Sequence, residues 1–309
     1  MRLETWPRMA VVGAGAVGGY FGGLLARAGA PVTFIGRPRF VDAVGRHGLR
    51  METLQFREVL RVVATASPEG VRGADVVLFC VKTVDTDVTA RAIVPFLDRE
   101  ARVLVMQNGV DGAQRFQIAA GHPARSAVVY VGASQPEPGV VRHEGRGDLV
   151  IDAAEDASAP LSGVFARAGI PCRVSDNMEG ELWAKLVSNC ALNALSALAR
   201  VPYGPIAASE SARQTVVWVV QEVMAVAQAA GVHVAGLDSP ADGVEVALRI
   251  ARQIPAAWSS TAQDLLGGRR TEIASLNGYV ARRGAELGVS TPVNQTLSAL
   301  MDLAERAPR

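Results

Sequence analysis

The stretch Met9-Ala-Val-Val-Gly-Ala-Gly-Ala-Val-Gly18 decides the fold that this sequence predicts. Its first four residues are apolar and predict a buried strand, a helical pattern follows up to Gly29, and residues 31–35 predict a second strand. In such a unit a glycine turn lets backbone N–H groups approach a pyrophosphate at the start of a helix. A glycine turn that serves only packing is the alternative. The candidate dinucleotide-binding residues are Gly13, Ala14, Gly15, Ala16, Val17 and Gly18.

The segment after the second strand indicates which dinucleotide binds. NAD-binding folds usually place Asp or Glu there, about 20 residues after the glycine turn, to bind the ribose hydroxyls. This chain instead has Gly36-Arg37-Pro38-Arg39. An arginine cannot accept hydrogen bonds from a ribose diol, but it pairs well with a 2′-phosphate. We therefore expect NADP, as NADPH, to be the cofactor, with a solvated loop arginine as the alternative interpretation of Arg37.

Further apolar runs continue the strand pattern at residues 59–63, 74–81 and 102–106. The last two end at Lys82 and at Gln107-Asn108-Gly109. Ligands of open parallel sheets lie outside the carboxyl ends of the strands, so Lys82 and Asn108 are expected to meet the cofactor. The alternatives are a solvated strand-end charge and a turn-forming asparagine. Residues 139–143 and 148–152, joined through Gly145 and Gly147, predict a hairpin that closes the sheet.

Length and composition limit the other possibilities. A chain of 309 residues is long enough for two domains. Because 31 Lys and Arg offset 30 Asp and Glu, we expect neither nucleic acid nor a membrane surface as a partner. No apolar run is long enough to predict a membrane span. The three cysteines are scattered without a Cys-x-x-Cys pair, which indicates a reducing, cytoplasmic location.

From residue 177 onward the periodicity becomes helical, and one helix carries an unusual polar file. Lys185, Asn189 and Asn193 are spaced four residues apart, so they follow one side of the helix with a drift of about 40° each. Asparagine is a mediocre helix former, so two of them in register with a lysine suggest a binding site. A wet helix surface is the alternative.

A second polar cluster lies between residues 259 and 278. Ser259 or Ser260 is expected to cap a helix, and Gly267-Gly268 to end it. Thr271-Glu272 is then expected to open the next helix, where a glutamate in the first turn is common because it compensates the helix dipole. The four histidines show no metal-ligand spacing, so no metal site is expected.

Taken together, these residues resemble the ketopantoate reductases (2-dehydropantoate 2-reductases) over nearly the whole chain. The resemblance rests on the glycine turn, Lys82, Gln107-Asn108-Gly109, the Lys185–Asn193 file, and Ser259-Ser260 followed by Thr271-Glu272-Ile and Asn277-Gly278. The extension of the file to Asn193 and the segment from Ser259 to Gly278 are its most specific parts.

The resemblance implies an α/β fold: an N-terminal Rossmann domain, residues 1–175, that binds NADP, followed by an all-α substrate and catalytic domain, residues 176–309. It implies reduction of 2-dehydropantoate to (R)-pantoate, on the route to pantothenate and coenzyme A. By position, Lys185 and Glu272 match the catalytic residues. Those matching substrate-binding positions are Asn189, Asn193, Ser260 and Asn108. Those matching cofactor-side positions are the glycine turn, Arg37, Lys82, Asn108 and Glu272.

The chemistry of these side chains agrees with that assignment. Hydride transfer to a ketone carbon leaves negative charge on its oxygen, and a lysine ammonium supplies both a countercharge and a proton. Lys185 is thus the natural general acid for a small-molecule 2-keto acid. Two alternatives remain: a paralogue that reduces another branched or aromatic 2-keto acid, as D-mandelate dehydrogenase-like members do, and a non-catalytic NADPH-binding sensor. A homodimer is a candidate assembly.

Overall fold

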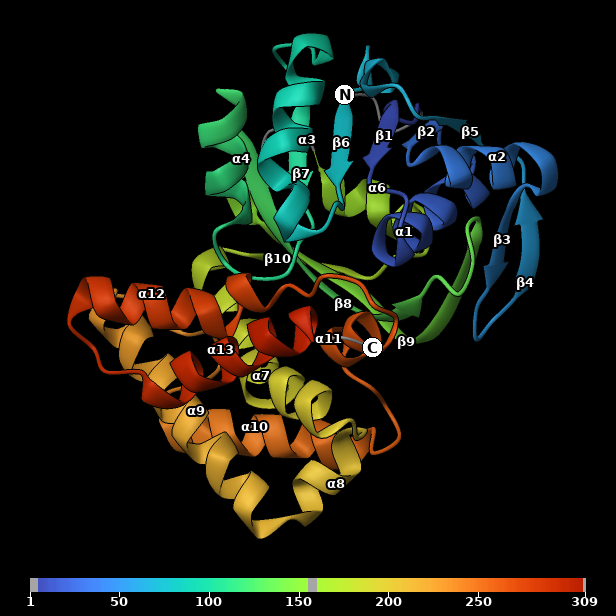
Figure 1. The fold of residues 1–309 in the computed structure, drawn as a ribbon. Helices are drawn as coiled ribbons and strands as arrows, with labels where there is room; N and C mark the ends of the chain where they lie inside the picture. Colours follow the sequence, from blue (N-terminus) through green and yellow to red (C-terminus); the bar gives the residue numbers. More distant parts are fainter. Residues whose placement is uncertain (1–4, 155–159, 308–309) are drawn as a thin grey trace. The chain divides into compact units, whose positions relative to one another are not determined.

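The computed structural model describes residues 5–154 and 160–307 and divides the chain into two compact units (Figure 1). The first, which we call the sheet unit, contains the residues up to Gln107 together with Asp111–Met178. The second, the helical unit, contains Asn108–Val110 together with the residues from Glu179 onward. Asn108–Val110, which come shortly after the strand that ends at Val105, are therefore grouped with the helices, whereas Gln107 belongs to the sheet unit.

The sheet unit alternates strands and helices over most of its length. Its strands are β1 (Met9–Val12), β2 (Val32–Ile35), β3 (Leu49–Glu52), β4 (Arg57–Leu60), β5 (Val63–Thr65), β6 (Val76–Phe79), β7 (Arg102–Val105), β8 (Ala124–Ser134), β9 (Val140–Asp152) and β10 (Cys172–Ser175). Its helices are α1 (Ala16–Arg27), α2 (Pro38–His47), α3 (Thr86–Ile93), α4 (Gly112–Ala120) and α6 (Leu161–Arg167), with short 3₁₀ turns η1 (Pro68–Val71), η2 (Thr83–Asp85) and η3 (Val94–Phe96).

The centre of this unit is a parallel sheet in the order β5-β2-β1-β6-β7-β8. This is the strand order of dinucleotide-binding folds, in which the chain reverses direction beside the first strand. Alternate residues of β1 enter separate hydrophobic clusters, Met9 and Val11 with α1 and α6, and Ala10 and Val12 with α3 and α4. Helices thus cover both faces, which explains the nearly continuous apolar runs of the central strands. The predicted Rossmann fold is confirmed.

The predicted hairpin over residues 139–152 is wrong. Residues 140–152 form the single strand β9, which runs antiparallel to β8, and β8 also extends the parallel sheet by pairing its first residues with β7. The pairing with β8 shifts register at two points of this ladder, at Gly147 and between His143 and Gly145. Arg146 has φ 55° and Gly147 φ 130°, so the backbone departs from extended geometry without reversing direction.

The apolar run over residues 59–63 also differs from the prediction of one strand. It is divided between β4, which pairs antiparallel with β3, and β5, which pairs parallel with β2. These strands lie at opposite ends of the sheet order. Hydrophobicity alone could not reveal the break, because only one polar residue, Arg61, interrupts the apolar residues from Val59 to Val63.

The helical unit is built around the long helix α7 (Met178–Ala199), whose apolar residues share one hydrophobic cluster with the valines of α9. The other elements of the unit are α8 (Tyr203–Ala208), α9 (Glu210–Ala229), α10 (Pro240–Gln253), α11 (Ser260–Leu266), η4 (Ile273–Ser275), α12 (Asn277–Leu287) and α13 (Pro292–Arg306). Helix α10 packs closely at Gly243, where a Cβ would lie only 2.8 Å from Val220 and 3.2 Å from Val187. The predicted all-helical C-terminal region is confirmed.

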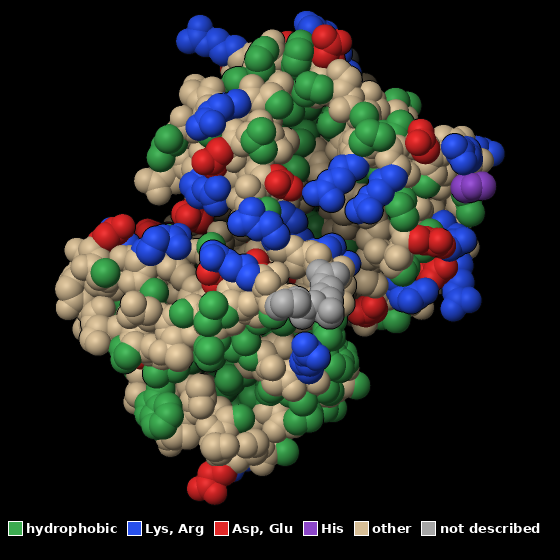
Figure 2. All heavy atoms as spheres, in the orientation of Figure 1, with side chains coloured by type: hydrophobic (Ala, Val, Ile, Leu, Met, Phe, Trp, Pro, Cys, Tyr) green, Lys and Arg blue, Asp and Glu red, His purple; other side chains and the backbone are tan. Residues whose placement is uncertain are grey.

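Figure 2 shows how charge is distributed on one face of the molecule. Basic and acidic side chains are interspersed over the sheet unit, whereas few charged side chains lie over α8 and α9, where hydrophobic side chains alternate with uncharged atoms. Within residues 5–154 and 160–307, none of the helices combines the length and the apolar character needed to cross a bilayer.

Candidate active site

The glycine turn of the sheet unit is fixed by close backbone packing. Gly13 has φ +95°, its N–H donates to the carbonyl of Ile35 at 2.9 Å, and a Cβ at this position would lie 2.6 Å from the Val81 nitrogen. A Cβ at Gly18, in the first turns of α1, would lie 2.3 Å from the Gly13 oxygen. Both positions require glycine, so the turn holds the start of α1 against the ends of β1, β2 and β6.

Gly15 differs from its neighbours because a Cβ there would meet no protein atom within 4 Å. Packing within the chain therefore does not explain this glycine, whereas close approach of a ligand does. Gly15 is the N-cap of α1, which has no side-chain cap and no acidic residue in its first turn. The Gln135 amide donates to the Ala14 carbonyl at 2.8 Å and holds the turn from the other side. These features fit a dinucleotide pyrophosphate.

The carboxyl ends of β6 and β7 are joined by Gln107. Its amide nitrogen donates to the Val81 carbonyl and to the Thr86 hydroxyl, both at 2.8 Å. Lys82, the N-cap of the turn η2, lies half-buried beside these groups. The prediction that Lys82 stands at a strand end within the dinucleotide-binding fold therefore agrees with its observed place.

Arg37 follows β2 and is the N-cap of α2. Its side chain is 71% exposed, and its guanidinium lies 3.5 Å from the carboxylate of Asp85, the last residue of η2. Because exposed ion pairs of this kind are weak, the guanidinium can turn toward a ligand at little cost.

In the helical unit, α7 carries the predicted polar file. Lys185 and Asn189 are half-buried, and Asn193 is buried. The Asn193 side-chain oxygen accepts a hydrogen bond from the Tyr203 hydroxyl at 3.1 Å. Burial raises the pKa of Tyr203 to about 12, which keeps this hydroxyl a donor at neutral pH. Because the side-chain oxygen of Asn193 accepts this hydrogen bond, its amide N–H groups can donate to other acceptors.

The segment from Ser259 to Asn277 is tied to α7 at both ends. The Ser259 hydroxyl donates to the Asn193 carbonyl at 3.2 Å, and the Asn277 amide donates to the Cys190 carbonyl at 3.1 Å. Ser259 is also the cap of α11, since its oxygen accepts from the Ala262 N–H, whereas Ser260 is exposed. The structure thus brings two clusters that are far apart in sequence to the same part of one helix.

Glu272 lies within this tethered segment and is 6% exposed. Its carboxylate accepts a hydrogen bond from the Asn108 amide at 2.8 Å, so these two predicted residues are in direct contact. The next residue of the Asn108 loop, Gly109, has φ +89°, and a Cβ there would lie 2.7 Å from the Ser275 oxygen. The expectation that Thr271-Glu272 opens a helix holds only for a short 3₁₀ turn: Glu272 is the N-cap of η4, and the α-helix α12 begins at Asn277.

A second carboxylate holds the residue before Glu272. Glu305, near the end of α13, accepts from both the backbone N–H and the hydroxyl of Thr271. Thr271 is itself buried. Glu305 of α13 therefore fixes the backbone just before Glu272, while Asn108 holds the Glu272 carboxylate.

Sequence reasoning missed several residues of this arrangement. Asp85, Gln135, Tyr203 and Glu305 belong to no motif, and each acts through a partner more than nine residues away in the chain. One compositional signal was available, because Lys82 and Lys185 are the only lysines among the 31 Lys and Arg. Arginine replaces lysine poorly where a proton must be released near neutral pH, so two such lysines at candidate site positions are informative.

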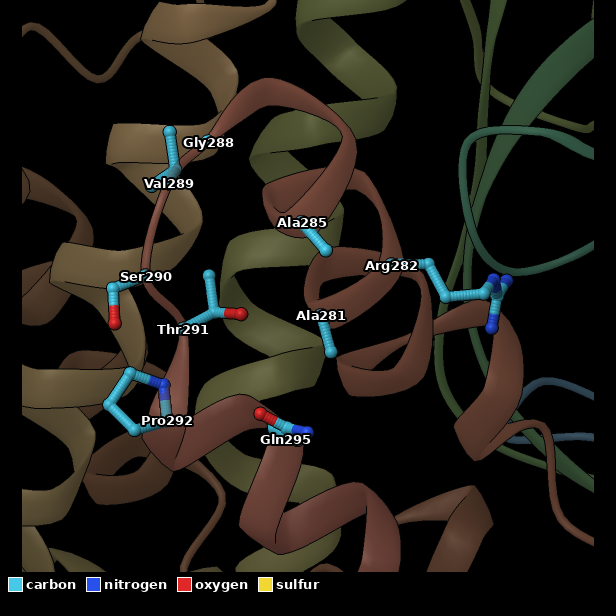
Figure 3. A pocket seen from close by; sticks show the side chains of 9 residues that line it. All are labelled: Ala281, Arg282, Ala285, Gly288, Val289, Ser290, Thr291, Pro292 and Gln295. Carbon is cyan, nitrogen blue, oxygen red and sulfur yellow. The ribbon is translucent and has the colours of Figure 1, made fainter.

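The hollow shown in Figure 3 is separate from these residues. It has a volume of about 600 Å³ and lies between α12, α13 and the loop that joins them. Its lining includes small side chains such as Ala281 and Ala285, and Arg282 extends away from the loop. The hollow contains none of the predicted site residues. Within the described part of the chain, no group of three or more His, Cys, Asp or Glu is arranged to hold a metal ion.

Comparison with known proteins agrees with this geometry. Residues 9–156 match the family model described as "Ketopantoate reductase PanE/ApbA", and residues 177–305 match the model of its C-terminal part. The chain is 35% identical to a 2-dehydropantoate 2-reductase of Halobacterium salinarum, with 97% of this chain and 99% of the relative covered. It is 34% identical to a 2-dehydropantoate 2-reductase of Caulobacter vibrioides, with 96% and 98% covered.

Solved structures give the same result. A PanE/ApbA family ketopantoate reductase from Ralstonia eutropha has a TM-score of 0.90 at 46% identity, with 97% of this chain and 98% of that chain covered. A D-mandelate dehydrogenase in a ternary structure with NADH and anilino(oxo)acetate also has a TM-score of 0.90, with the same coverage. At 23% identity, the second likeness shows the shared fold alone.

Proposed function

The chain belongs to the ketopantoate reductase family, and from this premise we propose that it reduces 2-dehydropantoate to (R)-pantoate with NADPH. The observation that carries the proposal is the hydrogen bond between Asn108 and Glu272. Within the helical unit it joins Asn108 to the segment that is tethered to α7, the helix that carries the polar file. Two candidate site residues that are far apart in sequence are thereby held in direct contact.

In the proposed mechanism Lys185 is the general acid. When bound, a nicotinamide would supply the hydride, and negative charge would develop on the ketone oxygen of the substrate. The Lys185 ammonium stabilises that charge and then donates the proton that completes the alcohol. Arginine in the same place would supply only the charge, because its pKa is too high to release a proton.

The remaining polar residues orient the substrate. Asn189 and Asn193 offer amide donors that do not titrate, which suits a carboxylate or hydroxyl of the keto acid. Ser260, exposed at the start of α11, is a further substrate donor. Glu272 is held by Asn108 and accepts from a substrate hydroxyl. A hydroxyl group near the ketone therefore distinguishes the preferred substrate from simpler 2-keto acids.

Binding of the dinucleotide cofactor is assigned to the glycine turn, Lys82, Asn108 and Arg37. The turn fits a pyrophosphate because Gly15 leaves open space at the start of α1. Arg37 stands where an NAD-specific fold carries an acid, which supports NADPH as the preferred form. Arg37→Asp should abolish or reverse the preference, and equal efficiency of the unmodified protein with NADPH and NADH would contradict it.

Steady-state turnover against a small panel of 2-keto acids tests the substrate. We expect 2-dehydropantoate to give the highest kcat/KM with NADPH. A higher value for phenylglyoxylate or a branched 2-keto acid without the hydroxyl would assign the chain to a paralogous reductase of the D-mandelate dehydrogenase type. NADPH binding without turnover of any substrate would indicate a sensor.

Two wider proposals accompany this function. We place the protein in the cytoplasm, which is supported by its scattered cysteines and by its proposed use of NADPH.

We also propose a homodimer, because one structural relative is described as a dimeric ketopantoate reductase from Staphylococcus aureus. Sedimentation of the purified chain tests the second proposal, and a monomer at micromolar concentration would contradict it.

A further inference from the structure

The ion pair between Arg37 and Asp85 joins two strand ends on either side of the glycine turn. Gly13 lies close to both ends, since its N–H donates to Ile35 at the end of β2 and a Cβ on it would lie 2.6 Å from the Val81 nitrogen after β6. Arg37 follows β2 by two residues, and Asp85 ends the turn η2 that follows β6. The pair therefore lies beside the turn that is assigned to the dinucleotide.

We propose that Asp85 is a specificity-determining residue that weakens binding of a 2′-phosphorylated cofactor and so moderates the preference for NADPH. The proposal rests on the proposed function, in which Arg37 binds the 2′-phosphate. The Arg37 guanidinium lies 3.5 Å from the Asp85 carboxylate, so a group that binds to this guanidinium comes close to a negative charge. A phosphate monoester carries nearly two negative charges at neutral pH, so it meets a repulsive charge there that a ribose hydroxyl does not.

The chemistry of the carboxylate also favours the cofactor without the phosphate. Carboxylates accept hydrogen bonds from ribose hydroxyls, and Asp or Glu performs this task in NAD-binding folds. Here the acid is supplied after β6 rather than at the end of β2. Arg37 thus offers a partner for the 2′-phosphate of NADPH, and Asp85 offers a partner for the ribose hydroxyl of NADH.

Exposure limits the size of the effect. The two side chains are 71% and 42% exposed, so solvent and salt screen their charges. Basic side chains nearby, Arg39 on α2 and Lys82 at the start of η2, add attraction for the phosphate. Removing one negative charge beside the bound phosphate, in a solvent-exposed environment, should change the affinity for the phosphate about three- to tenfold.

Binding of two cofactor fragments to the full chain tests the proposal without any catalytic step. Adenosine 2′,5′-bisphosphate contains the 2′-phosphate, and adenosine 5′-monophosphate lacks it, so calorimetry gives the ratio of their Kd values. The variants are Asp85→Asn, which removes the charge, and Asp85→Glu, which keeps it. Asp87→Asn is the matched control, because Asp87 lies two residues further and pairs with Arg115 at 2.9 Å instead.

We expect Asp85→Asn to raise the preference for the 2′-phosphorylated fragment about three- to tenfold, while Asp85→Glu and Asp87→Asn stay within about twofold of the unmodified protein. An unchanged ratio in Asp85→Asn, or an equal rise in Asp87→Asn, would overturn the proposal. A fall in the ratio would also overturn it, since Asp85 would then serve to position Arg37.

Arg37→Gln separates this proposal from the one on which it rests. If Arg37→Gln leaves the ratio unchanged, Arg37 does not bind the phosphate and the assignment of NADPH loses its support. If Arg37→Gln lowers the ratio but Asp85→Asn does not raise it, only the role of Asp85 fails. Thermal unfolding of each variant verifies that the fold is retained.

Discussion

The sheet unit and the helical unit build their parts of the site in different ways. In the sheet unit the central feature is backbone: among the six residues from Gly13 to Gly18, at the start of α1, two glycines are required by packing and one faces open space. In the helical unit the site is made of side chains from separate segments, brought together by hydrogen bonds from Ser259 and Asn277 to α7 and from Asn108 to Glu272.

This difference determines what a substitution does in each unit. Adding a single Cβ to the turn disturbs the fold itself, because backbone atoms stand in the way. Removing a functional group from the helical unit leaves the apolar cluster around α7 intact and affects chemistry or substrate binding. The first unit should therefore be sensitive to added atoms and the second to lost charges and hydrogen bonds.

Gly13→Ala should have the largest effect on stability. Its φ of +95° and the 2.6 Å approach of a Cβ to the Val81 nitrogen combine backbone strain with overpacking. Each contributes about 1–3 kcal/mol, so the free energy of unfolding should fall by about 2–6 kcal/mol. Chemical denaturation measures the loss.

Gly15→Ala is the matched control for that variant. Its Cβ would meet no protein atom, so stability should change by less than about 1 kcal/mol while NADPH affinity falls. If Gly13→Ala were as stable as Gly15→Ala, the packing account of the turn would be wrong.

Glu272→Gln should mainly affect the substrate. The glutamine keeps an oxygen for the Asn108 amide but loses the charge. Hydrogen bonds to charged groups contribute about 1.5–3 kcal/mol, so kcat/KM for the keto acid should fall about 10- to 100-fold. Glu286→Gln makes the same change on the exposed side of α12, where Glu286 pairs with Arg283. Equal kcat/KM values for the two variants would exclude Glu272 from substrate binding.

Tyr203→Phe should have the smallest effect, acting through Asn193. Loss of the hydrogen bond at 3.1 Å should raise KM about three- to tenfold, in line with about 0.5–1.5 kcal/mol for a neutral hydrogen bond. In an Asn193→Ala background the same change should have no further effect. A full additional loss of affinity in the double variant would show that Tyr203 acts independently of Asn193.

The same tyrosine predicts a pH dependence of stability. Its pKa is raised to about 12 by burial, whereas tyrosines of the unfolded chain ionise near 10. The folded state holds the proton more tightly, so this contribution to the free energy of unfolding is present below pH 10 and is lost as the pH rises through about 12. Tyr203→Phe should show a smaller decrease over this range, and an unchanged decrease would contradict the assignment.

The contrast between the units also explains how much the sequence could predict. The glycine turn, its flanking strands and Arg37 are contiguous, so local pattern was sufficient to place them. The polar file on α7 was visible because helical spacing puts Lys185 and Asn193 on one side. The contact of Asn108 with Glu272 spans 164 residues. The position of Asn108 after a strand had suggested a place at the cofactor, whereas only family resemblance had suggested that Glu272 belongs to the site.

Local pattern failed where tertiary pairing decides the structure. Gly145 and Gly147 have the composition of a turn, but pairing of β9 with the long strand β8 keeps them within one strand. The polar run around Glu272 predicted a helix start, but only the 3₁₀ turn η4 begins there. The hydrogen bonds from Asn108 to Glu272 and from Thr271 to Glu305 could not be foreseen from the local sequence. Partners distant in sequence carry no local signal.

The most direct test of the account is to measure kcat and NADPH affinity together in Lys185→Ala. Loss of a positioned general acid should lower kcat at least about 100-fold, with the Kd for NADPH within about twofold of the unmodified protein. Lys185→Arg is the matched control, since it keeps the charge but cannot release a proton, and its kcat should also fall. Near-normal turnover by a folded Lys185→Ala, or a parallel loss of NADPH binding, would contradict the assignment of the chemistry to the helical unit.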